Sequence, residues 1–197
     1  MSTNPFSIAS HGARGPYGRL AELRHLESII ETGGSAVLWC SLPNGRSELL
    51  QMLLQRLAQT GRRAVLLAAE TLPPDVAVEA FWSRIQLGIG LDGDDSSPSD
   101  LQIARPAGHS VVLIDDLDRV VRFDSLARPD VWGKLRGLTQ HGGISVIATS
   151  SVDTIELNQL TSHYNYGSPF FNGMRSIPLH PLHPAAVQEW LDDAGRD

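Results

Sequence analysis

The feature that most constrains the fold is a stretch at residues 37–50, where an apolar run, a turn-forming loop and an amphipathic run follow one another directly. Residues 37–39 are apolar and typical of a buried strand. Residues 43–45, which read Pro-Asn-Gly, favour a turn. Leucines then recur at helical spacing from Leu49 onward. The stretch therefore predicts a strand that passes through a tight loop into a helix.

Strand and helix patterns alternate along the rest of the chain. Apolar runs that predict strands lie at residues 36–40, 63–69, 111–114, 144–149 and 175–179. Helical periodicity lies at residues 19–32, 47–59, 76–87, 131–140, 154–160 and 184–191. Strands that are apolar on both faces are covered on both sides, and this alternation favours a parallel sheet. We therefore predict an α/β fold with a mostly parallel sheet of about five strands and helices on both faces.

The remaining segments complete the predicted organisation. Residues 1–16 are rich in Ser, Gly and Pro and predict a flexible N-terminal segment. The periodic pattern breaks down at residues 88–108, and residues 91–100 within them are acidic and turn-forming, which predicts an exposed loop. Residues 17–197 are expected to form the folded domain.

The loop between the first predicted strand and its helix matches the phosphate-binding pattern G-x-x-x-x-G-K-[ST] at two of four positions. Gly45 and Ser47 match, whereas Cys40 stands at the first glycine and Arg46 at the lysine. In an intact loop, backbone N–H groups and the helix N-terminus hold the phosphates, and these donors do not depend on side chains. We interpret the segment as an eroded phosphate loop. The predicted nucleotide-binding residues are Pro43, Asn44, Gly45, Arg46, Ser47 and Glu48.

The two altered positions leave a second interpretation open. Arg46 keeps the positive charge, but its guanidinium is longer and planar and does not replace a lysine freely at a tight site. Cys40 adds a Cβ where a tight turn usually requires glycine. The alternative is an ordinary strand–turn–helix junction that binds no phosphate, with Ser47 as the N-cap of the helix.

Polar residues also end two other predicted strands. Asp115 and Asp116 follow the third apolar run, and Thr149 ends the fourth. Ligands collect at the carboxyl ends of parallel strands, and carboxylates there are costly unless exposed, paired or metal-bound. We predict Ser47 and Asp115 as Mg²⁺ ligands, and Asp116 and Thr149 as catalytic residues that orient water and sense phosphate. The alternative is that these groups only satisfy the backbone at the strand ends, and Asp118 is expected to face solvent or pair with a neighbouring arginine.

Composition excludes several classes of protein. A single cysteine excludes internal disulfides and cysteine zinc clusters. Sixteen basic against 22 acidic residues give a formal charge of -6, which argues against a nucleic-acid partner. Neither a signal peptide nor an apolar run long enough to cross a bilayer is found, so no membrane partner is expected and a cytoplasmic location is the default expectation.

These patterns together resemble the P-loop ATPases of the AAA+/STAND group, in particular bacterial AAA-like ATPase domains of signalling and conflict proteins. Gly18 and Arg19 are similar to the Gly-Arg pair that precedes the first helix of that family. Residues 111–118 look like its Walker B strand, and residues 148–150 fall at its sensor strand. Residues 179–182, Leu-His-Pro-Leu, resemble its Leu-x-Pro-Leu segment. The resemblance implies a three-layer P-loop NTPase-like sandwich and ATP or ADP with Mg²⁺ as cofactor.

The departures at Cys40 and Arg46 then imply a degenerate Walker A motif, and no helical lid is expected after the last strand. The resemblance implies a regulatory or scaffold module that binds ATP or ADP weakly or not at all and is at most a weak ATPase. It would act with a protein partner or effector domain, or as a homo-oligomer, in bacterial signalling or defence. Two alternatives stay open: an active ATPase that uses Arg46 in place of the lysine, and a pseudo-ATPase that only binds protein partners.

Overall fold

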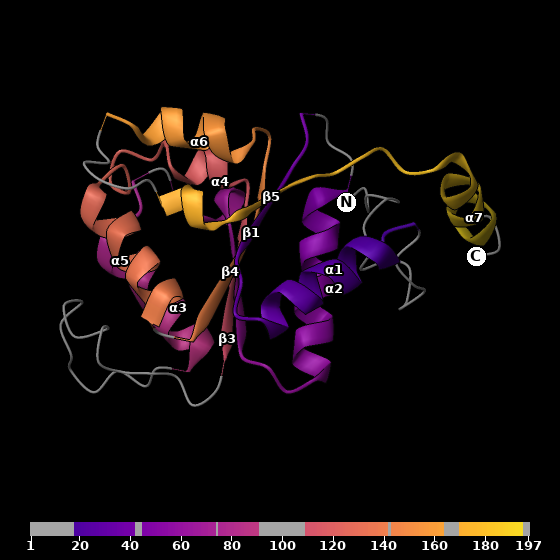
Figure 1. Ribbon diagram of the computed structural model, residues 1–197, viewed down its shortest axis with the longest axis horizontal. Helices are drawn as coiled ribbons and strands as arrows, with labels where there is room; N and C mark the ends of the chain where they lie inside the picture. The colour runs from indigo at the N-terminus through magenta and orange to yellow at the C-terminus, as the bar shows by residue number, and fades with distance from the viewer. Residues whose placement is uncertain are drawn as a thin grey trace.

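The structure is a computed structural model that describes residues 18–41, 45–73, 75–90, 109–141, 143–163 and 170–194. The predicted N-terminal segment at residues 1–16 lies outside the described residues, as do Pro43 and Asn44 and most of the predicted acidic loop. The described part is built around one sheet with helices on both sides (Figure 1).

The sheet has five strands, all parallel, in the order β2-β3-β4-β1-β5. The strands are β1 (Ala36–Trp39), β2 (Ala64–Ala68), β3 (Ser110–Asp115), β4 (Ile144–Ser150) and β5 (Arg175–Pro178). Because β4 lies between β1 and β3, the carboxyl ends of these three strands meet at one edge of the sheet. The predicted α/β fold with a parallel five-stranded sheet is confirmed.

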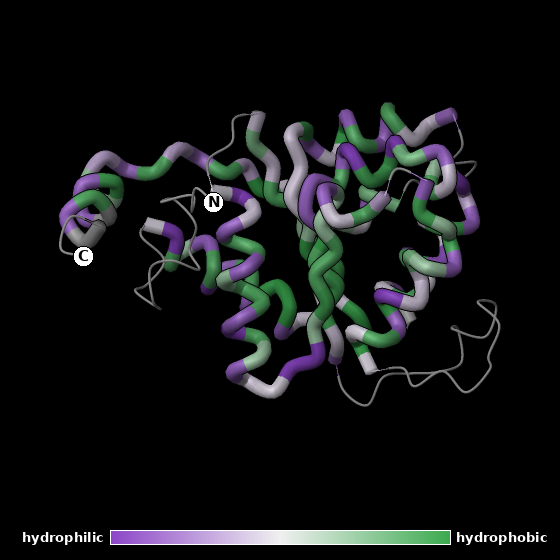
Figure 2. The backbone as a smooth tube through the Cα atoms, turned by 180° about the vertical axis from the view of Figure 1, so that it is seen from behind, coloured by the Kyte–Doolittle hydropathy of each residue, from purple (hydrophilic) through white to green (hydrophobic). Residues whose placement is uncertain are grey.

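The main helices form the two outer layers. α1 (Leu20–Glu31) and α2 (Arg46–Gln59) lie on one face, and α3 (Val78–Ile89) and α5 (Pro129–His141) lie on the other (Figure 1). Alternate strand residues supply the two cores: Leu38 packs with the α1 and α2 residues, and Val37 with those of α3 and α5. Every residue of β3 and β4 is buried, and Figure 2 shows the central strands as the most hydrophobic part of the chain. The predicted helices on both faces are therefore confirmed.

Shorter elements complete the chain. They are η2 (Ala69–Thr71), α4 (Leu117–Val120), α6 (Thr154–Thr161), η4 (Phe170–Gly173) and α7 (Pro184–Ala194). The periodicity did not predict α4, which has only four residues. α7 lies at the far side of the α1 and α2 layer in Figure 1 and meets the chain just before α1, where a Cβ on Gly18 would lie 2.6 Å from the Cβ of Ala186. Within the described residues, no helix is long and apolar enough to cross a membrane.

The third predicted helix, at residues 76–87, ends too early. Gly88 and Ile89 still belong to α3, and Gly90 ends the helix in the left-handed conformation with φ +67°. Glycine at residue 88 permits a close approach to the sheet, because a Cβ there would lie 2.3 Å from the Cβ of Val65. Gly88 is therefore a packing position inside the helix.

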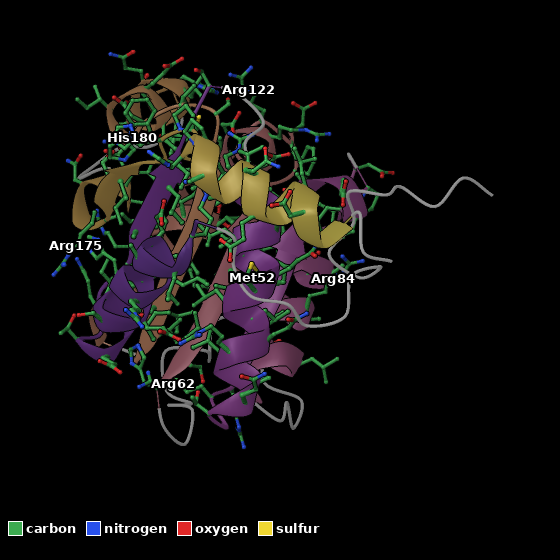
Figure 3. The ribbon with its side chains drawn as sticks, turned by 90° about the vertical axis from the view of Figure 1, so that its right-hand side faces the viewer. Met52, Arg62, Arg84, Arg122, Arg175 and His180 are labelled. Carbon is green, nitrogen blue, oxygen red and sulfur yellow. The ribbon has the colours of Figure 1, made fainter. Side chains whose placement is uncertain are left out.

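The amino and carboxyl edges of the sheet, where the amino and carboxyl ends of its parallel strands lie, can be followed in Figure 3. Arg62, just before β2, marks the amino edge, and Arg122, just after α4, marks the carboxyl edge. Arg175 is the first residue of β5, and His180 follows the end of that strand. Among the described strands, β5 is paired only with β1. The predicted site residues belong to the carboxyl edge.

Candidate functional site at the carboxyl edge of the sheet

The predicted phosphate loop ends at the N-terminus of α2. Gly45 is the N-cap and has φ +82°, a conformation that glycine adopts without strain. The first intrahelical hydrogen bond runs from the Leu49 N–H to the Gly45 carbonyl, at 3.0 Å. The alternative prediction that Ser47 is the N-cap is therefore wrong, because Ser47 lies inside the first turn. The N–H groups of Arg46, Ser47 and Glu48 have no intrahelical acceptor and lie at the positive end of the helix dipole.

Arg46 does not extend into solvent but turns back across the carboxyl edge. Its Nη1 donates to the Cys40 carbonyl at 2.8 Å, and its Nη2 donates to Asp116 Oδ1 at 3.2 Å. The Arg46 side chain is 14% exposed and the Asp116 side chain 27% exposed. One guanidinium therefore links the end of β1 to the residue after β3. The sequence motif contained Arg46 but no signal for this partner.

Asp116 is held in position by its own backbone. It has φ 52° and is the one residue other than glycine with a positive φ in the described part of the chain. Its N–H donates to Thr149 Oγ1 at 3.0 Å, and its carbonyl accepts from the N–H of Arg119 at 2.9 Å and of Val120 at 3.2 Å. Aspartate tolerates the left-handed conformation better than most residues. The side-chain Nη1 of Arg119 lies 3.4 Å from the second carboxylate oxygen, so two guanidiniums face Asp116.

Thr149 joins the ends of β3 and β4. Its hydroxyl donates to Asp115 Oδ1 and accepts from the Asp116 N–H. Thr149 is fully buried and Asp115 is 7% exposed. The structure thus brings the predicted residues Asp115, Asp116 and Thr149 together, as the strand ends implied. These bonds are those of a strand-end hydroxyl that satisfies its neighbours, and the catalytic roles of Asp116 and Thr149 stay predictions.

Asp118 was predicted to face solvent or pair with an arginine, and this prediction is wrong. Asp118 is 8% exposed, and its two carboxylate oxygens accept from the Ser151 N–H at 2.9 Å and the Ser151 hydroxyl at 2.6 Å. The single turn of α4 carries Asp118 back toward the end of β4. The row of hydroxyl residues at 149–151 was the available signal for acceptors on the facing strand.

The arrangement does not fit the Mg²⁺ ion that accompanies nucleotide in P-loop sites. The Ser47 hydroxyl has no hydrogen-bond partner among the described residues, which suits a metal ligand. However, Asp115 accepts the Thr149 hydroxyl, and Asp116 faces the Arg46 guanidinium. The metal roles of Ser47 and Asp115 stay predictions.

The amino edge of the sheet carries a different set of polar groups. His109 Nε2 lies 2.8 Å from Ser145 Oγ, and Ser35 Oγ accepts from the Val146 N–H at 2.9 Å. Burial lowers the pKa of His109, and the charge of Arg62 lowers it further. A cavity of about 350 Å³ opens at this edge between the α1–β1 turn, the end of α5 and η4. No sequence motif pointed to this cavity.

Fold and site together define the class: the parallel sheet and its helices form a P-loop NTPase-like fold. No protein-family model matches the sequence, and no curated protein matches it significantly. Solved structures do match this fold, among them replication initiators and a Walker-type ATPase. At the low identities of these matches, the likeness shows the fold alone.

Three of these structures illustrate the match. A Walker-type ATPase of Pyrococcus abyssi is 17% identical with a TM-score of 0.62, over 92% of this chain and 58% of that one. Domain III of the Thermotoga maritima replication initiation protein DnaA is 13% identical with a TM-score of 0.57, over 93% and 71%. AMPPCP-bound DnaA from Aquifex aeolicus is 14% identical with a TM-score of 0.56, over 91% and 53%. The chain thus spans only 53% of the Aquifex chain and 58% of the Pyrococcus chain.

Proposed function

We propose that this chain is a regulatory P-loop domain that binds ATP or ADP weakly at the carboxyl edge and hydrolyses it slowly or not at all. The ion pair between Arg46 and Asp116 carries the proposal. Asp116 would have to orient the attacking water in a working ATPase, and here its carboxylate is engaged by the guanidiniums of Arg46 and Arg119.

Three observations support binding of an adenine nucleotide. Gly45 leaves the first-turn N–H groups of α2 without a side-chain cap, and such a helix start favours phosphate. Arg46 keeps a cation at the loop, and guanidinium pairs well with phosphate oxygens. The DnaA structure from Aquifex aeolicus, which shares this fold, binds AMPPCP.

The same ion pair explains why binding should be weak. A phosphate that recruits Arg46 must compete with Asp116 for the guanidinium. A partly buried pair of this kind contributes about 1 to 2 kcal/mol, so the competition weakens binding by roughly a factor of ten. Binding would also change the contacts of Asp116 and Arg119 at the start of α4, which gives the domain two states that a protein partner or effector domain can distinguish.

Isothermal titration with ATP and with ADP, alongside an assay of phosphate release, tests the proposal. We expect saturable binding with a dissociation constant above about 10 µM and phosphate release at background. Arg46→Met, which keeps an unbranched side chain but removes the guanidinium and its charge, should weaken binding. Arg128→Met is the matched control, because Arg128 pairs with Asp130 in an exposed position and has no contact with Asp116.

Two outcomes would establish the alternatives instead. Turnover in the native chain that collapses in Asp116→Asn would show an active ATPase in which Arg46 replaces the lysine. Absence of heat and of thermal shift at about 1 mM nucleotide would show a domain that only binds protein partners. The second alternative draws on the same geometry, since Arg46 already has internal partners in Cys40 and Asp116.

A further inference from the structure

We infer that the site takes its nucleotide free of metal, with the Arg46 guanidinium in the place that Mg²⁺ holds in other P-loop sites. This inference rests on the proposed function, because it specifies how the phosphates are neutralised at the same edge. We draw it because the described residues around Asp115 and Asp116 do not suit a Mg²⁺ ion.

Two guanidiniums place positive charge beside the Asp116 carboxylate. The Arg46 guanidinium is fixed between the Cys40 carbonyl and the Asp116 carboxylate, and its side chain is 14% exposed. Arg119 lies against the other oxygen of the same carboxylate at 3.4 Å. A divalent cation held by the adjacent Asp115 would face the largely buried Arg46 guanidinium, where water screens the repulsion only partly. The Arg119 side chain is 57% exposed and adds a weaker repulsion.

The surroundings of Asp115 also do not match the ligands that Mg²⁺ needs. Mg²⁺ requires near-octahedral geometry and keeps several of its waters. Asp115 is 7% exposed, and Oδ1 of its carboxylate accepts the hydroxyl of the fully buried Thr149. The described residues therefore offer an aspartate that is already hydrogen-bonded and sheltered from solvent, which does not suit a hydrated ion.

The start of α2 offers hydrogen-bond donors to a phosphate. The first turn of α2 presents N–H groups to an anion, and Arg46 belongs to that same turn. A guanidinium donates in a fork that matches two phosphate oxygens, which a lysine ammonium does not. A nucleoside diphosphate without metal carries more negative charge than its Mg²⁺ complex, so this site should prefer the metal-free form.

Titration of ADP into the native chain, once with Mg²⁺ and once with EDTA, tests the inference. We expect ADP to bind at least as tightly in EDTA as in Mg²⁺. Tightening by Mg²⁺ of more than about twofold would overturn the inference while leaving the proposed nucleotide binding intact. Absence of binding in both buffers would overturn the proposed function and the inference with it.

The variant Arg46→Lys provides the matched comparison. Lysine restores a compact cation that cannot bridge Cys40 and Asp116 in the same planar way. We expect Mg²⁺ to tighten ADP binding to this variant by about fivefold or more, the opposite sign from the native chain. An unchanged Mg²⁺ response in Arg46→Lys would contradict the role of Arg46. Thermal unfolding of both proteins checks that the variant folds, and the native titration is decisive without it.

Discussion

At both the amino and the carboxyl edge, side-chain hydrogen bonds join neighbouring strands, but the charged groups beside them differ. At the amino edge, the hydroxyl of Ser35 accepts from the β4 backbone, and His109 pairs with Ser145. At the carboxyl edge, Thr149 also joins neighbouring strands, but the groups around it are ionised. The amino edge shows that hydrogen bonds without a carboxylate are sufficient to join the strands there. The ion pairs of Asp116 with Arg46 and Arg119 therefore distinguish the carboxyl edge and mark it as the candidate site.

Within the carboxyl edge, the contact expected to contribute most to stability is that of Asp118 with Ser151. Asp118→Ala leaves two donors of the partly buried Ser151 unpaired, which should lower the free energy of unfolding by about 2 to 4 kcal/mol. Denaturant unfolding measures the loss. Asp124→Ala, an exposed aspartate in the same connection between β3 and α5, should stay within about 0.5 kcal/mol. Equal, small losses in both variants would show that the Asp118 contact does not hold the edge together.

Thr149 should come next. Thr149→Val keeps the shape of the side chain but removes the hydroxyl that bonds Asp115 and the Asp116 N–H. We expect a loss of about 1 to 3 kcal/mol in the free energy of unfolding. Thr149→Ser retains the hydroxyl and should recover more than half of it. If the serine variant were as unstable as the valine variant, packing rather than hydrogen bonding would be the reason.

The smallest effect is expected at the amino edge, from pH. Because burial and Arg62 lower the pKa of His109 from its ordinary 6.5, the unfolded chain takes up the proton at a higher pH than the folded chain. The folded state therefore loses stability as pH falls through the unfolded value, and this contribution is fully present above it. Between about pH 7.5 and pH 5.5, the native chain should lose more stability than His109→Gln. His25→Gln, at an exposed position of α1, is the control and should follow the native chain. A His109→Gln curve parallel to the native one would contradict the assignment.

The sequence predicted the sheet well for a physical reason. Apolar runs such as residues 111–114 are buried on both faces, so their pattern carries the fold without further information. The meeting of Asp115, Asp116 and Thr149 followed from the parallel strands that they end. Both predictions needed only the direction and order of elements.

Other features could not be predicted because they depend on tertiary contacts. A long side chain such as Arg46 takes whichever acceptors the fold presents, and the motif did not indicate Asp116 as its partner. The four-residue α4 is too short to show periodicity, so the inward direction of Asp118 was missed. The predicted helix ended at residue 87, whereas α3 continues through Gly88, where it packs against Val65 of a strand more than twenty positions earlier.

The ion pair between Arg46 and Asp116 is tested most directly by a double-mutant cycle. Arg46→Met, Asp116→Asn and the double variant are unfolded in denaturant, and asparagine is chosen because it also tolerates the left-handed backbone of residue 116. We expect a coupling free energy of about 1 kcal/mol or more, larger than that of the exposed Arg128–Asp130 pair. Effects that add within about 0.3 kcal/mol would show that Arg46 does not hold Asp116 in solution.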